Sequence, residues 1–118
     1  MPLAIKHNMG VVVKRPLANV AWRHDAPPEE EYHVPYWERF QKLQYPLQSL
    51  PLNEAVAIAM RFTASIPGVS TMIVGTTKPG RWSDNAAIIA QGNLPAEEFY
   101  ILRNHWNEVK GDDWVGLQ

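Results

Sequence analysis

The stretch from Gly75 to Lys78 carries side chains and backbone groups that could bind an anion. It follows a short apolar run, contains the hydroxyl groups of Thr76 and Thr77 and the ammonium group of Lys78, and precedes Pro79. Proline suits the first turn of a helix, so we expect a helix to begin at Lys78 or Pro79. The unpaired N–H groups and the positive dipole end of such a helix are a natural seat for an anion.

Arg81 and Asn85 lie four residues apart on this expected helix, so both side chains leave from one face. A guanidinium offers paired N–H donors to a phosphate, and a carboxamide both donates to and accepts from a purine edge. The pair would therefore suit an adenosine that carries a 2′-phosphate. A simpler interpretation is also open, in which Gly75 to Thr77 is only a turn and Arg81 pairs with Asp84 for about 0.2 to 0.5 kcal/mol.

The chain pattern predicts an α/β fold that would position these groups. Residues 10 to 15 (GVVVKR) show no polar alternation, which predicts a strand buried on both faces, and Thr71 to Gly75 forms a second short apolar strand. The order of strand, helices, strand, helices predicts two parallel strands joined by a right-handed crossover. Helices are expected at residues 35–44, at residues 52–65 with Asn53 as N-cap, from Lys78 or Pro79 to just before Gly92, and at Pro95 to Lys110 with an apolar stripe of Phe99, Leu102, Trp106 and Val109.

The carboxyl ends of parallel strands point the same way, so the segments that follow the two strands should share one rim. These segments are the irregular loop of residues 16–35 and the turn of residues 75–79. Ligands bind at this rim in α/β folds, and long loops in compact domains are often functional. Two parallel strands leave an unpaired edge on each side, whereas three or more strands are normally needed. We therefore expect homo-oligomers or a complementing partner fragment.

Composition and charge exclude several classes of function. The 118 residues, 46% hydrophobic and 19% charged, predict one soluble globular domain spanning residues 1–118. A net charge of -1 provides no basic field for nucleic acid, and the absence of cysteine excludes a disulfide framework and a thiolate nucleophile. The opening residues lack the apolar core of a signal peptide, and no segment reaches the ~20 apolar residues that span a bilayer. We expect a cytoplasmic protein that does not bind membranes.

Histidines offer little support for a metal or acid–base site. His24 stands beside Asp25, with His33 nearby, but no spacing typical of metal ligands is present. The surrounding prolines favour a polar surface loop. We therefore predict no metal site in this chain.

Three segments resemble the carboxyl-terminal part of the aldo-keto reductases. They are GTTKPGRWSDN, the upstream VVVKRPLANVAW and the terminal DWVGLQ, and the likeness runs from about Gly10 to the end. That family folds as a (β/α)8 TIM barrel and reduces aldehydes and ketones with NADPH. The resemblance implies that the chain is a partial barrel, a carboxyl-terminal fragment that carries the last two βα units.

The resemblance also implies roles for individual residues in binding NADP(H). The turn after the second strand would lie by the adenosine phosphates, Arg81 would hold the 2′-phosphate or cover the adenine, and Asn85 would bind the adenine edge. Asp84 would contact the adenosine, and the loop that begins at Leu17 would pass over the pyrophosphate. Lys78 is included because it belongs to the turn expected to bind an anion. The expected site therefore comprises Leu17, Ala18, Asn19, Gly75, Thr76, Thr77, Lys78, Arg81, Asp84 and Asn85.

The sequence departs from the family in two respects. Lys14 stands where many members have a tyrosine that stacks on the nicotinamide. The family's catalytic Asp, Tyr, Lys and His lie upstream of anything present here, in a barrel of roughly 250 residues. Two hypotheses therefore stay open: an NADP(H)-binding part of an oxidoreductase that is inactive by itself, or a catalytically inactive remnant that acts as an oligomerising interaction module.

Overall fold

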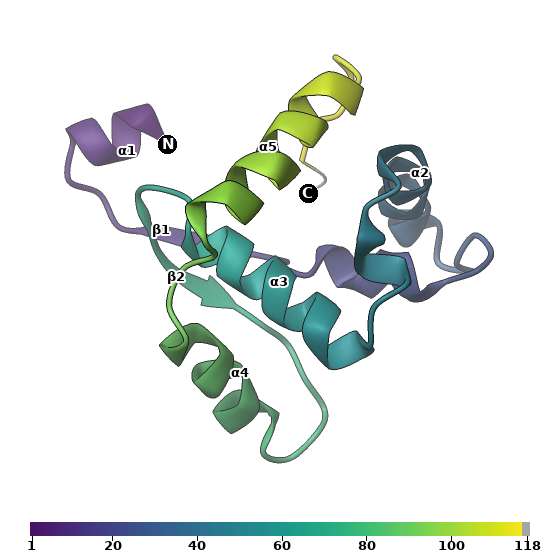
Figure 1. Cartoon of the computed structure of the whole chain (residues 1–118), viewed down its shortest axis with the longest axis horizontal. Coiled ribbons are helices and arrows are strands. Elements are labelled where there is room, and N and C mark those ends of the chain that lie inside the picture. The colour runs from purple at the N-terminus through teal and green to yellow at the C-terminus, as the bar shows by residue number, and fades with distance from the viewer. Residues whose placement is uncertain (117–118) are drawn as a thin grey trace.

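The computed structural model describes residues 1–116 of the chain. Leu117 and Gln118, the last two residues of the DWVGLQ ending, lie outside the described residues. Figure 1 shows helices packed beside a small sheet. The strands are β1 (Val11–Lys14) and β2 (Val69–Ile73), the α-helices are α1 (Pro2–Lys6), α2 (Val34–Leu43), α3 (Leu52–Ala64), α4 (Arg81–Ala90) and α5 (Ala96–Val109), and the 3-10 turns are η1 (Ala18–Arg23), η2 (Glu31–His33) and η3 (Pro46–Gln48).

The sheet consists of β1 and β2 paired in parallel, so the predicted α/β class with two parallel strands is confirmed. α2 and α3 lie in the connection between the strands (Figure 1). β2 begins at Val69 and ends at Ile73, two residues before its expected limits at both ends.

The prediction that residues 10–15 form a strand buried on both faces is wrong for this chain. Val13 pairs with Met72, and both are half-buried on the face that packs toward the core. Val12 and Ile73 face the other way and are 57% and 62% exposed. Within residues 1–116 the helices cover one face of the sheet, so the second face, which carries Lys14 and Thr71 beside Val12 and Ile73, stays open to solvent.

The core forms where α3 meets the loop after β1. Its buried cluster comprises Trp22, Leu47, Ala55, Val56 and Met60. Every residue from Ala55 to the end of α3 is buried or half-buried, which confirms the prediction that little of this helix faces water. Full burial of a large apolar side chain, such as that of Met60, stabilises the fold by roughly 1.5 to 3 kcal/mol.

The start of α3 differs from the prediction. Pro51 occupies the N-cap position, and its carbonyl oxygen accepts hydrogen bonds from the backbone N–H groups of Glu54 and Ala55. Asn53 is already inside the first turn, and the helix has no side-chain cap. The extended backbone of Pro51 leads directly into the helix, so the helix begins before Asn53 could cap it.

Two contacts at the end of α3 fix the segment between α4 and α5. The guanidinium of Arg61 donates to the carbonyl oxygens of Gly92 and Asn93 at 2.9 and 2.7 Å. The backbone N–H of Leu94 donates to Oγ of Ser65 at 2.9 Å. Gly92 has a φ of +84° directly after the C-cap of α4, as predicted for the residue that ends this helix. These bonds hold α4 beside α3, and so place the rim residues that α4 carries.

The apolar stripe predicted on the last helix is confirmed. Phe99, Leu102, Trp106 and Val109 are half-buried on α5, between mostly exposed neighbours. Phe99 stacks on Phe62 of α3 with ring centroids 5.0 Å apart.

Candidate functional site

Loops from both strands meet at one pocket of about 230 Å³, at the carboxyl ends of the strands. The loop after β1 contributes from one side, the turn between β2 and α4 from the other, and the beginning of α3 closes the base. Seven of the ten residues predicted to bind NADP(H) line it: Leu17, Gly75, Thr76, Thr77, Lys78, Arg81 and Asn85.

Arg81 and Asn85 share one face of α4, and both are half-buried while the intervening Ser83 and Asp84 are exposed. A pair between Arg81 and Asp84, the simpler interpretation of the sequence, does not form. The ion pair between His33 and Glu30, at 3.5 Å, is the only salt bridge found within residues 1–116. The Arg81 side chain is therefore not held by a neighbouring carboxylate and lines the pocket as a cation.

The expected start of α4 at Lys78 or Pro79 is wrong. The helix begins at Arg81, after Gly80 with a φ of +81°, a backbone conformation that glycine adopts at little cost. The N–H of Arg81 bonds to the carbonyl of Lys78, and the N–H of Lys78 bonds to Oγ1 of Thr76.

The start of α4 therefore offers fewer free backbone N–H donors to an anion than predicted. The N–H groups of Ser83 and Asp84 are both bonded to the carbonyl of Gly80, so they are turned into the helix rather than left for a ligand. The positive character of the pocket therefore comes from side chains.

The remaining predicted residues do not line this pocket. Asp84 is exposed on another face of α4, and Ala18 lines a different cavity. The φ angles of Ala18, Asn19 and Val20 are +43°, +55° and +58°, so the chain turns sharply in left-handed backbone conformations. As a result Leu17 and Val20 reach the pocket and Asn19 does not.

Arg23 lines the pocket although sequence reasoning did not single it out. It stands at the end of η1, in the long loop that was predicted to share a rim with residues 75–79. Together with Lys78 and Arg81 it makes three cations among the lining residues, which include no carboxylate. Such a set would attract a phosphorylated ligand. The further unpredicted lining residues are the apolar Val20, Leu52, Val56 and Val74.

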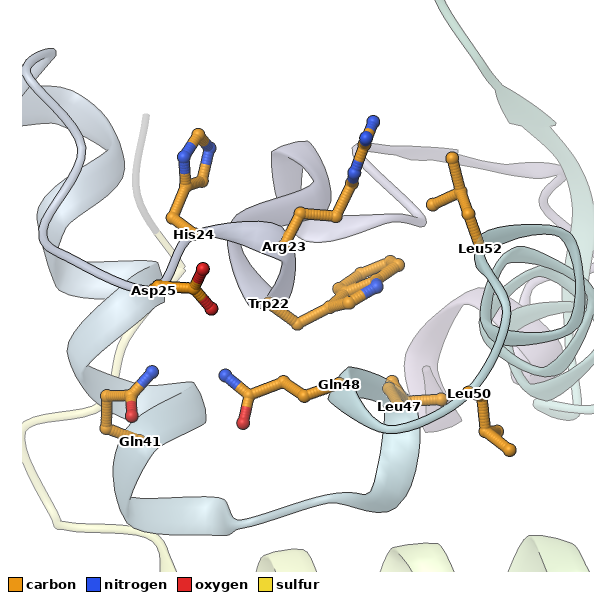
Figure 2. Close-up of a pocket in the computed structure, with 9 residues that line it drawn as sticks. All are labelled: Trp22, Arg23, His24, Asp25, Gln41, Leu47, Gln48, Leu50 and Leu52. Carbon is orange, nitrogen blue, oxygen red and sulfur yellow. The ribbon is translucent and has the colours of Figure 1, made fainter.

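A second hollow, of about 380 Å³, adjoins the same loop and is shown in Figure 2. Its polar residues include Asp25, which lies opposite Gln41 and Gln48, and His24, whose ring points away from these two amides. Both His24 and Asp25 are exposed, as predicted for a surface loop. Residues 1–116 contain no group of three His, Cys, Asp or Glu side chains placed to hold a metal ion.

The helices of the described chain, up to residue 116, are all too short or too polar to cross a membrane. No family model matches the chain, and neither a curated protein nor a solved structure matches it. The likeness to the aldo-keto reductases therefore stays a prediction from the sequence motifs.

Proposed function

We propose that this chain is the NADP(H)-binding carboxyl-terminal part of an aldo-keto reductase-like oxidoreductase, which reduces aldehydes or ketones by hydride transfer in the cytoplasm. One observation carries the proposal. Arg81, Asn85 and the Thr76–Lys78 turn line one pocket with Arg23, which comes from the loop after the other strand. No carboxylate lies among the lining residues.

The chemistry of the lining side chains suits an adenosine with a 2′-phosphate. The guanidinium of Arg81 offers paired donors to the phosphate, with Lys78 and Arg23 adding positive charge. The Asn85 amide can both donate to and accept from the adenine edge. Ala18, Asn19 and Asp84 are left out of the proposed contact set because they do not line the pocket.

The size of the pocket limits what this chain can hold. At about 230 Å³ it is smaller than the ~300 to 1,000 Å³ of ordinary cofactor sites. It would therefore take the adenosine end of NADPH, while the nicotinamide end would need walls from the rest of a barrel. Hydride transfer would also need a proton donor for the carbonyl, which the family carries upstream of the segment present here.

The arrangement of the sheet supports a partial (β/α)8 barrel. In such a barrel the strands lie inside and the helices form an outer ring. Here helices pack on the Val13 and Met72 face, and the opposite face, with Val12 and Ile73 beside Lys14 and Thr71, is bare within residues 1–116. The bare face would become the barrel interior once further strands closed the sheet.

Calorimetric titration of the chain with NADPH and with NADH tests the proposal. We expect weak binding of NADPH and weaker binding of NADH, because NADH lacks the 2′-phosphate that the cations would contact. Absence of heat with both cofactors, or equal affinity for both, contradicts the proposal.

A second candidate function, an oligomerising interaction module without turnover, is favoured by the open sheet. Both strand edges are unpaired within residues 1–116, and exposed strand edges pair readily with other chains. An oligomer that binds neither cofactor would support this alternative over the proposed oxidoreductase part.

A further inference from the structure

A separate apolar pocket, of about 330 Å³, lies on the covered face of the sheet. β1 contributes Val13, α3 contributes Ile58 and Phe62, and α5 contributes Leu102 and Trp106. One wall is aromatic: the rings of Trp22 and Phe40 meet edge to face at 5.5 Å, and those of Phe40 and Tyr45 at 6.4 Å. A cavity of this size and lining is typical of sites for small apolar ligands.

The charged side chains of this apolar pocket are all cationic. They are Arg15 and Arg103, and no carboxylate lies among the lining residues. Arg15 lies over the ring of Tyr32, 4.6 Å from its centroid. Arg103 is exposed on α5 and forms no ion pair within residues 1–116. An apolar interior with a cationic mouth is complementary to an amphiphilic anion.

Two polar groups in the aromatic wall are fully or partly buried. The Tyr45 hydroxyl donates to the carbonyl of Leu102 at 2.8 Å. Burial raises the pKa of Tyr45, and the positive charge of Arg103 lowers it by less, so the pKa is raised overall. The indole Nε1 of Trp22 is buried without an acceptor in the described part of the chain. Figure 2 shows this nitrogen on the side of the ring that faces Leu47, a residue that lines both the apolar pocket and the hollow drawn there.

We propose that the apolar pocket binds a free medium-chain carboxylate, with the hydrocarbon chain among the aromatic and aliphatic side chains and the carboxylate near Arg103. This site is distinct from the proposed nucleotide pocket, because Leu17 is the one lining residue that the two pockets share. The inference therefore does not rest on cofactor binding.

Calorimetric titration of the full chain with decanoate, at concentrations below micelle formation, tests the inference. We expect saturable binding that weakens about fourfold for each methylene removed, measured with nonanoate and octanoate. Decanol should bind more weakly than decanoate, and decylammonium more weakly still. The proposal is overturned if decanoate shows no saturable binding, or if decylammonium binds as tightly as decanoate. It is also overturned if the chain associates with anionic lipid vesicles but not with monomeric decanoate.

Two variants locate the site. Ala59 lines the apolar pocket, and Ala57 lies two residues away on another face of α3 and does not. Ala59→Leu should fill the pocket and weaken decanoate binding by roughly tenfold, while Ala57→Leu should leave it unchanged. Equal losses of decanoate affinity in both variants would show that the effect comes from general repacking of α3. That result would overturn the assignment of decanoate to the apolar pocket.

A substitution at Arg103 should not disturb folding, because this side chain is exposed. Arg103→Gln should weaken decanoate binding by roughly two- to fivefold and leave decanol binding unchanged. Lys42→Gln, which removes a charge from an exposed position outside the pocket, serves as the matched control. Arg81→Ala should leave decanoate binding intact, which separates this site from the proposed nucleotide pocket. An unchanged preference for decanoate over decanol in Arg103→Gln would refute the role of that residue.

Discussion

Replacing Arg81 with alanine should weaken NADPH binding selectively. Arg81 is half-buried, lines the nucleotide pocket and forms no ion pair within residues 1–116, so its guanidinium can meet a phosphate without first breaking a salt bridge. A hydrogen bond to a charged group contributes about 1.5 to 3 kcal/mol. Partial exposure, together with the cations Lys78 and Arg23 that remain, places the expected loss near the lower limit, about 1.5 kcal/mol or roughly tenfold in Kd.

The variant should remain folded. Arg81 is the first residue of α4, where a positive charge opposes the helix dipole and where alanine is a good helix former. The free energy of unfolding should therefore stay the same or rise slightly, as urea denaturation would show. Any loss of NADPH affinity then reflects the missing contact rather than a damaged fold.

The assay compares NADPH and NADH by calorimetry in the original chain, in Arg81→Ala and in Arg103→Ala. Arg103 is an exposed arginine on α5 that does not line the nucleotide pocket, so its removal controls for total charge. We expect a loss for NADPH in Arg81→Ala alone, with NADH almost unaffected. An equal loss for both cofactors would place Arg81 on the adenine instead, and an equal loss in both variants would refute a specific phosphate contact.

Four further outcomes follow from the same geometry. Asn85→Ala should weaken NADPH and NADH equally, by about 1 kcal/mol, because the adenine edge is common to both, and a loss confined to NADPH in calorimetry would contradict the assigned contact. Gly80→Ala should lower the free energy of unfolding by about 1 to 2 kcal/mol because Gly80 has a φ of +81°, and an unchanged urea midpoint would argue against α4 beginning at Arg81. Light scattering should give a mass above that of one chain, since the strand edges and the Val12 and Ile73 face are open; a monodisperse monomer would oppose this. Assays with aldehydes and NADPH should show no turnover by the chain alone, and measurable reduction would show that it carries a proton donor after all.

Local pattern predicted most of the elements. The valine run of β1, the apolar positions of α3 and the stripe of α5 are properties of neighbouring residues, and hydrophobic spacing is enough to predict them. Boundaries were less predictable, because backbone conformations decide them. Gly80 and Pro51 set the starts of α4 and α3, where the sequence also offered Pro79 and Asn53.

The sequence by itself determined that a strand-to-helix turn carries Thr76, Thr77 and Lys78, and that Arg81 and Asn85 leave one face of the next helix. Only the tertiary structure decided which partners join them. The left-handed turn at Ala18 to Val20 carries the loop so that Arg23 reaches the pocket and Asn19 does not. The open face of the sheet was likewise decided in three dimensions, because the pattern of a strand shows which side chains share a face but not whether another element covers that face.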